Sequence, residues 1–244
     1  MEMIMTFTKK LRLILMMPIL FSFAILPNVH PAYGAENCDS GGKCLGTQEL
    51  DSTVSFDQSG IKALVDIPNI TTSSTCAPNG NGFGVVSTWA FFANGEWIGI
   101  GVASGQIDGI CYDSEEHYYL EYMQDFDVNE FKLSGSPSPG EDIYFQVSDT
   151  NNDDTWQAYV DTSQAASLIM DFDYASETST GVEATDNNIS VPKTSITNVQ
   201  EHDGTDWDYW TYNDREYDQQ EGWIVQCTPN YKNIAVGVGG TESC

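Results

Sequence analysis

The stretch Trp97–Phe126, WIGIGVASGQIDGICYDSEEHYYLEYMQDF, decides the fold class of this chain. It begins with large apolar residues that alternate with glycines, and it ends with a run in which aromatic and acidic residues are mixed. Successive side chains of a β-strand point to opposite faces of the sheet. As a strand, the run would line one face with Tyr118, Leu120 and Tyr122 and the other with Tyr119, Glu121 and Met123. This pattern predicts a sheet with one face on a core and a second face that presents a carboxylate.

Short β-type runs continue on both sides of this stretch, divided by Gly, Pro, Asn and Asp residues, as is typical of strands and turns. The Asn94-Gly95 pair predicts a hairpin. No stretch shows a sustained helical period, so we predict an all-β, antiparallel two-sheet β-sandwich of the jelly-roll type. The expected strands are 61–67, 83–93, 96–102, 117–123, 130–133, 142–148, 155–161, 167–174, 195–200, 223–227 and 234–238.

Residues 1–35 have the features of a secretory signal peptide. Basic residues, the last of them Arg12, precede an apolar run from Leu13 to Leu26, and small residues follow up to Ala35. The run is shorter than the roughly 20 residues that span a bilayer. We therefore expect cleavage near Ala35, a secreted, extracellular protein and no stable membrane insertion. A retained membrane anchor is the alternative.

Two parts are expected after the leader: a disulfide-tied N-terminal arm at 36–60, which is polar and aperiodic, and a single β-sandwich domain at 61–244. An even number of cysteines in an exported chain favours disulfides over free thiols. The glycines of CDSGGKC favour Cys38 with Cys44, and two further pairs then follow as one of the possible connectivities. No CxxC pair exists, so we expect no zinc site. The six cysteines are Cys38, Cys44, Cys76, Cys111, Cys227 and Cys244.

The chain is strongly acidic, with 9 Lys and Arg against 36 Asp and Glu and a formal net charge of −27. Such a surface repels phosphate and gains no binding free energy from counterion release. We therefore expect no nucleic-acid partner. Either an acidic or a saline habitat would reduce the self-repulsion. We expect a monomer.

Three motifs in order resemble those of the glutamic peptidases (eqolisins), secreted endopeptidases with a concanavalin A-like jelly roll. They are Trp97-Ile98-Gly99-Ile100-Gly101, Tyr118-Tyr119-Leu120-Glu121-Tyr122-Met123 and Gly140-Glu141-Asp142-Ile143. The resemblance covers roughly 85–200. It implies peptide hydrolysis at acid pH in which a glutamate activates water and a glutamine amide stabilises the oxyanion, without a metal or other cofactor.

The resemblance implies Gln106 and Glu183 as the catalytic residues. An ungapped comparison places Ser104 at the glutamine position, and Gln106, two residues later, keeps the strand parity. Glu183 is the candidate base, and Glu177 is the alternative. Trp97, Tyr119 and Glu121 would line a groove that binds an extended peptide. Both catalytic groups must meet at one site for this chemistry.

A carbohydrate-binding, lectin-like sandwich is the alternative function, with a glycan polymer as the partner. The acidic and aromatic segment 202–221 is expected to be a long loop or an insertion between late strands, and its residues Trp207 and Trp210 could stack on sugar rings or cap an open edge of the core. A histidine-based hydrolase finds little support, because only His117 and His202 follow the leader. The run from Asp149 to Asp154 lacks the glycine and the glutamate of a calcium loop, so we expect a polar turn there.

Overall fold

A computed structural model describes residues 44–51, 58–72, 83–184, 189–210, 216–219, 223–227 and 234–238. Every element within these ranges is a β-strand, and all the strand pairs that they form are antiparallel. Across the same ranges, no helix is long and apolar enough to cross a membrane. The predicted all-β, antiparallel two-sheet sandwich is confirmed.

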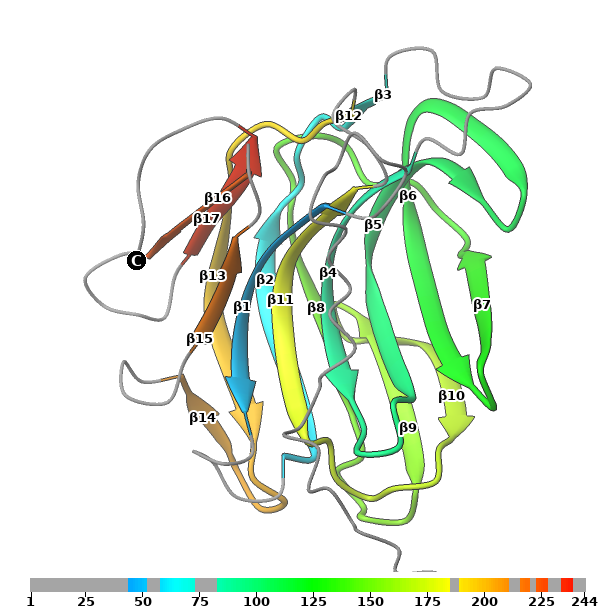
Figure 1. Cartoon of the computed structure of the whole chain (residues 1–244), viewed down its shortest axis with the longest axis vertical. Coiled ribbons are helices and arrows are strands. Elements are labelled where there is room, and N and C mark those ends of the chain that lie inside the picture. The colour runs from blue at the N-terminus through cyan, green and yellow to red at the C-terminus, as the bar shows by residue number, and fades with distance from the viewer. Residues whose placement is uncertain are drawn as a thin grey trace, which may run out of the picture. The chain divides into compact units, whose positions relative to one another are not determined.

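The first sheet has seven strands, which lie side by side from left to right in Figure 1. Its centre is formed by three long strands that follow one another in the chain and pair as two hairpins. In spatial order the strands are β15 (Glu216–Gln219), β1 (Cys44–Asp51), β11 (Glu177–Ala184), β4 (Phe83–Phe91), β5 (Trp97–Ile107), β6 (Ile110–Gln124) and β7 (Asp127–Lys132).

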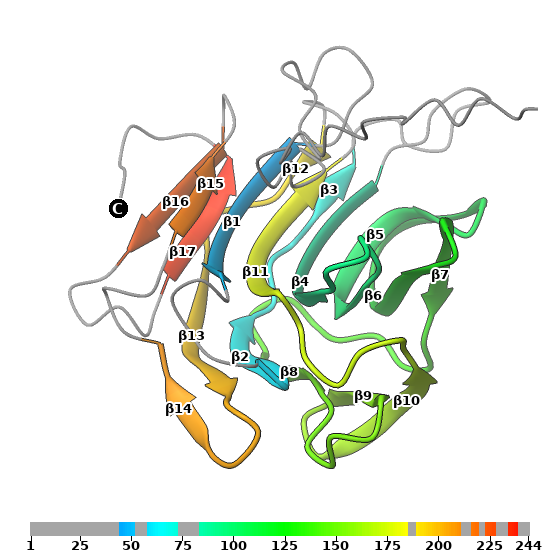
Figure 2. The same ribbon diagram turned by 60° about the horizontal axis from the view of Figure 1, so that its bottom comes forward.

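The second sheet is eight-stranded and packs against the first, and much of it lies below the first sheet in the rotated view of Figure 2. Its order is β10 (Ser163–Ile169), β9 (Thr155–Val160), β8 (Asp142–Ser148), β2 (Gly60–Asp66), β13 (Thr194–His202), β17 (Ile234–Val238) and β16 (Trp223–Cys227), with β14 (Trp207–Tyr209) paired to β13. Two short strands, β3 (Thr71–Thr72) and β12 (Ile189–Ser190), pair separately.

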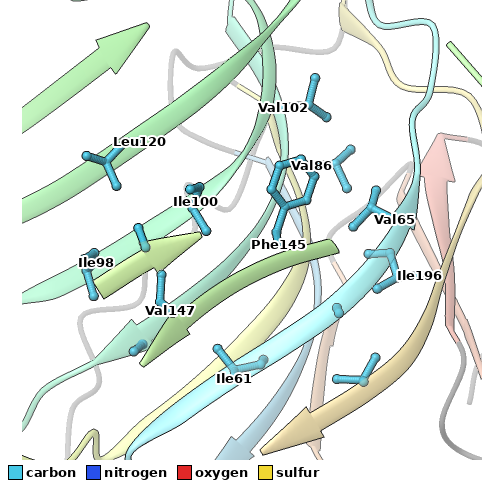
Figure 3. Close-up of a cluster of buried hydrophobic side chains, with 14 of the residues drawn as sticks. Ile61, Val65, Val86, Ile98, Ile100, Val102, Leu120, Phe145, Val147 and Ile196 are labelled. Carbon is cyan, nitrogen blue, oxygen red and sulfur yellow. The ribbon is translucent and has the colours of Figure 1, made fainter. Parts of the chain in front are cut away.

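The main core fills the space between the two sheets (Figure 3). Strand alternation supplies it, because the even-numbered residues of β4 and β5, and those of β6 after His117, point inward. Burial of such apolar side chains stabilises the fold by roughly 1.5–3 kcal/mol for each large residue. The core residues labelled in Figure 3 are Val86, Ile98, Ile100, Val102 and Leu120 from the first sheet, and Ile61, Val65, Phe145, Val147 and Ile196 from the second.

Most of the predicted strands are present, and three agree in both bounds: 142–148, 223–227 and 234–238. Part of the segment 36–60, which the sequence predicts to be an arm, belongs to the sheet. Cys44–Asp51 forms β1, which pairs with a strand on each side. The segment 202–221 is not one long loop, because it contains β14 and β15, and the alternative of an insertion between late strands is left. Neither segment has a strong β pattern, so long-range pairing overrides local propensity there.

Some predictions fall outside the described residues. They include the signal peptide at 1–35, together with Cys38, Cys76 and Cys244. The side chains of the remaining three cysteines also fall outside, so the disulfide pairing stays a prediction.

Candidate outer-face site

The outer face of the seven-stranded sheet, which is the face turned away from the main core, carries the chemistry-bearing side chains. The odd-numbered residues of β4 and β5, and those of β6 from His117 onward, lie on it, because their even-numbered neighbours fill the core. Part of this face forms a second buried apolar cluster, made of Phe83, Val85, Trp89, Trp97, Ala103, Ile107 and Tyr119.

The strand register sets outer-face residues into rows that cross the sheet. One row runs through Glu49, Ser179, Trp89, Gly99, Glu121 and Glu130. The next row runs through Thr47, Gly181, Ser87, Gly101, Tyr119 and Lys132. Residues directly opposite on paired strands have their Cβ atoms about 4.5–5.5 Å apart. Carboxylates from three different strands therefore share this face with aromatic rings.

Glu121 is a carboxylate on the outer face that hydrogen bonds hold in place. It is only 1% exposed. Trp89 Nε1 donates a hydrogen bond to its Oε1 at 2.6 Å, and the Tyr119 hydroxyl donates to its Oε2 at 3.0 Å. Hydrogen bonds to an ionised acceptor are short and strong, and they offset the cost of burying the charge. Glu121 is thus held in one position by two aromatic side chains.

The glycines of the WIGIG motif make this arrangement possible. A Cβ at Gly99 would lie 2.3 Å from Trp89 Cδ1 and 2.6 Å from Trp89 Nε1, so the indole occupies the space above Gly99. A Cβ at Gly101 would lie 2.0 Å from the carbonyl oxygen of Val86. Both glycines are therefore required by close packing, and Gly99 lets the Trp89 indole reach across β5 to Glu121 on β6.

Tyr119 is surrounded by negative charge. Burial raises the pKa of its hydroxyl far above the ordinary value, and the charges of Glu121, Glu130 and Glu183 raise this pKa further. The hydroxyl therefore stays protonated and serves as a donor to Glu121. Glu130 on β7 lies directly opposite Glu121, and Glu183 lies on the same face of the sheet on the more distant strand β11.

The accessible part of the outer face lies beside the buried group formed by Glu121, Trp89 and Tyr119. Phe91 and Met123 are half-buried and belong to the row that continues from Glu177 through Trp97 to Val128. Glu130 and Glu177 are also half-buried, at the two sides of this strip. The strip therefore offers apolar surface flanked by carboxylates.

A small basic group lies on the same face toward the start of β6. The Lys132 Nζ lies 4.8 Å from the centroid of the Tyr112 ring, in a cation–π contact. The Tyr112 ring packs edge to face against His117, whose Nδ1 lies 3.1 Å from the Ser136 hydroxyl. Burial, and then the charge of Lys132, holds the pKa of His117 below its ordinary value.

Trp97, Tyr119, Glu121 and Glu183 share the outer face, but Gln106 does not. Gly105 pairs with Phe83 on the outer face, and Ile107 belongs to the outer-face cluster, so alternation turns Gln106 between them to the opposite side. Gln106 and Glu183 therefore lie on opposite faces of the sheet, as do Gln106 and the alternative base Glu177, which pairs with Phe91. The structure does not bring the predicted peptidase dyad together.

The two tryptophans of the predicted glycan-binding loop lie in different environments. Trp210 is 1% exposed and belongs to the main core, so neither of its ring faces is open to a sugar. Trp207 is half-buried on β14, in the eight-stranded sheet, where Lys62 Nζ lies 4.3 Å from its ring centroid. Its ring also packs against His202. Neither tryptophan is part of the outer face.

The turn that follows Asp149 is polar, as predicted. The Asp149 carboxylate accepts hydrogen bonds from the backbone N–H groups of Asn151 and Asp153, and burial raises its pKa. Among the residues that the structure describes, no group of three or more His, Cys, Asp or Glu side chains is arranged to hold a metal ion.

Trp89 is the main site residue that the sequence reasoning missed. The hairpin signal at Asn94-Gly95 placed it on a strand next to the WIGIG run. The loop has three residues, Ala93 to Gly95, with Gly95 in the left-handed region at a φ of 89°. This loop pairs Trp89 with Gly99. A two-residue loop would shift the register by one and put the indole elsewhere.

Comparisons with known proteins assign no family. No protein-family model matches the chain, and no curated protein is similar to it. Among solved structures, sheep galectin-11 in complex with glycerol is 14% identical, with a TM-score of 0.34, over 64% of this chain and 96% of that one. The catalytic domain of an endo-1,3-β-glucanase (laminarinase) from Thermotoga petrophila RKU-1 is 11% identical, with a TM-score of 0.36, over 81% and 78%.

A glycoside hydrolase family 16 endo-glucanase from Bacteroides ovatus is 12% identical, with a TM-score of 0.36, over 59% of this chain and 66% of that one. Similarity of this extent assigns no activity to the chain, and the fold class rests on the strand pairings described above.

Proposed function

We propose that this protein is an exported carbohydrate-binding β-sandwich that binds a neutral glycan polymer on the outer face of its seven-stranded sheet. The leader-like residues 1–35 support export. One observation carries the binding proposal: the half-buried apolar strip at Phe91 and Met123 lies between carboxylates, on a face whose centre is fixed by Glu121 and its two aromatic donors.

This combination fits the chemistry of a sugar. A pyranose ring has apolar C–H faces, which pack on an aromatic or thioether surface, and hydroxyl groups, which donate to carboxylates. Phe91 and Met123 would contact the ring faces, and Glu130 and Glu177 would accept hydrogen bonds from the hydroxyls. Glu121, Trp89 and Tyr119 would act beneath them as a rigid support, since pre-organisation lowers the entropic cost of binding.

The charge of the face favours a neutral glycan over an acidic one. Glu49, Glu121, Glu130, Glu177 and Glu183 all lie on it, in a chain whose net charge is −27. A polymer of sugar acids would be repelled by these groups, and more strongly at low salt.

A glycan array that includes neutral and acidic polysaccharides tests the proposal. We expect binding to neutral glycans, which the Phe91→Ala variant should weaken at least tenfold, equal to about 1.4 kcal/mol. Phe131→Ala is the matched control, because Phe131 pairs with the core-facing Leu120 and lies on the opposite side of the sheet. Absence of neutral-glycan binding by a folded protein, or equal losses in both variants, would contradict the proposal.

An extended polypeptide is the other polymer class that the sequence predicts. Incubation with a denatured protein between about pH 2 and 7 tests it, because carboxylates titrate within that range. Cleavage that survives Glu183→Gln would have to use residues other than the predicted dyad.

A further inference from the structure

Large apolar side chains that face solvent gather at one edge of the sandwich. Phe126 is 88% exposed and lies in the turn between β6 and β7, and Ile169 is 74% exposed and ends β10. The Gln124 side-chain amide donates a hydrogen bond to the backbone carbonyl of Ile169 at 3.0 Å, which ties the end of β6 to the end of β10. The β6–β7 turn and the end of β10 are accordingly neighbours in both ribbon views (Figures 1 and 2).

The backbone of Phe126 is strained, and its side chain is not buried in the fold. Gln124 pairs with Asp127, so the turn has two residues, Asp125 and Phe126, with φ values of 54° and 67°. This left-handed geometry normally takes Gly at the second position. The other end of β6 shows the normal solution, because the turn there is Asp108-Gly109, with φ values of 47° and 70°. A bulky residue kept in a strained and exposed position points to a role outside the fold.

The neighbouring strand β10 is an open and uncharged sheet edge. Among the described strands it is an edge strand of the eight-stranded sheet, and β9 is its one partner. Its sequence, SQAASLI, contains no charged residue and no proline, and most of its side chains are exposed. Natural sheets block such edges with charges, prolines or a covering segment. A β-bulge between Gln164 and Ala166 interrupts β10, and the Ile169 carbonyl at its end already accepts the Gln124 amide.

We propose that β10 and the Phe126 turn form the surface through which two copies of this chain associate, edge to edge, with β10 pairing antiparallel to β10 of the second copy. This goes beyond glycan binding and departs from the expected monomer. Two chains that each carry a charge of −27 repel each other over most of their surface. β10 itself contains no charged residue, and the nearest acidic residues, Asp161 and Asp171, lie just beyond its two ends. Antiparallel pairing of a strand with its own copy also satisfies a two-fold axis.

A lipid surface fits this edge less well than a second copy. Lipid cannot satisfy the open backbone groups of an edge strand. A second β10 supplies the missing backbone partners, and Phe126 and Ile169 supply apolar contact at the end of the strand.

Sedimentation velocity of the purified protein tests the proposal. We expect a species of twice the chain mass whose fraction rises with concentration, and also with salt, because salt screens the remaining repulsion. Ile169→Lys and Phe126→Lys should each weaken the dimer at least tenfold. Ile110→Lys is the matched control, because Ile110 is 54% exposed at the opposite end of β6 and should leave the dimer unchanged.

Amide hydrogen exchange supplies a second measurement. Protection of β10 amides should rise with protein concentration, and protection of β7, the edge strand of the other sheet, should not. A chain that stays monomeric up to about 1 mM, a dimer that survives both Lys variants in folded form, or a dimer that Ile110→Lys weakens equally would overturn the proposal. Binding of the wild-type monomer to neutral vesicles through Phe126 would also overturn it.

Discussion

Replacing Gly99 with alanine should displace the Trp89 indole, which holds Glu121 in place through a hydrogen bond. The new Cβ would lie 2.3 Å from Trp89 Cδ1 and 2.6 Å from Trp89 Nε1, far inside van der Waals contact. The indole must therefore move, and its N–H group, which donates to Glu121 Oε1 at 2.6 Å, must move with it. Glu121 would then keep its buried charge with a weakened set of donors.

The expected cost follows from two effects. Extra volume in a packed cluster costs about 1–3 kcal/mol, and a lost hydrogen bond to a charged group costs about 1.5–3 kcal/mol. The free energy of unfolding should therefore fall by about 2.5–6 kcal/mol, against a total of roughly 5–15 kcal/mol for a typical domain.

Urea unfolding followed by far-UV circular dichroism measures this loss, and a Trp89→Leu background supplies the control. In that background no indole lies over residue 99, so the second substitution should cost less than about 1 kcal/mol. A loss below about 1 kcal/mol in the wild-type background, or equal losses in the two backgrounds, would refute the packing argument.

Three further predictions test other parts of the structure. Tyr119→Phe removes the hydroxyl that donates to Glu121 and should lower the free energy of unfolding by about 1.5–3 kcal/mol; an unchanged urea midpoint would show that this bond is dispensable. Phe126→Gly relieves the left-handed turn and should raise that free energy by about 1 kcal/mol or more, whereas a loss would show that the ring stabilises the folded chain. Burial lowers the pKa of His202 below 6.5, its ordinary value, so the unfolded chain takes up a proton first and stability should fall as the pH drops through 6.5 toward the lower folded pKa. His202→Asn should flatten this decline in unfolding curves taken between about pH 7.5 and 5, and parallel declines in the two proteins would contradict the assignment.

The geometry at His202 explains why its neutral form is favoured. Its Nδ1 accepts the backbone N–H of Gly204 at 3.2 Å. A protonated Nδ1 could not accept this bond. The charges of Asp203 and Asp206 act in the opposite direction, but burial is the larger effect.

The face assignments of β6 were predictable from local sequence. Strand alternation alone put Leu120 toward a core and Glu121 on the other face, and the structure confirms both positions. The strand at 142–148 was predictable for the same reason, because an alternating run between turn residues needs only local information.

The site residues were harder to predict, because they depend on register and on burial by distant segments. Gln106 was expected beside Glu183, but the pairing of Gly105 with Phe83 turns it to the opposite face. Trp210 was expected on an exposed loop, whereas the main core buries it. Nothing in the neighbourhood of either residue in the sequence reports these long-range contacts.

The sequence by itself determined the all-β class, the hairpin at Asn94-Gly95 and the acidic character of the protein, because turn chemistry, period-two alternation and charge are local or additive properties. Only the tertiary structure decided that Trp89 reaches Glu121 across Gly99, that β1 completes the first sheet and that β10 ends the second. These features depend on strand order and register, which residues far apart in the chain set together: Trp89 and Glu121 are separated by 32 positions and meet through one hydrogen bond.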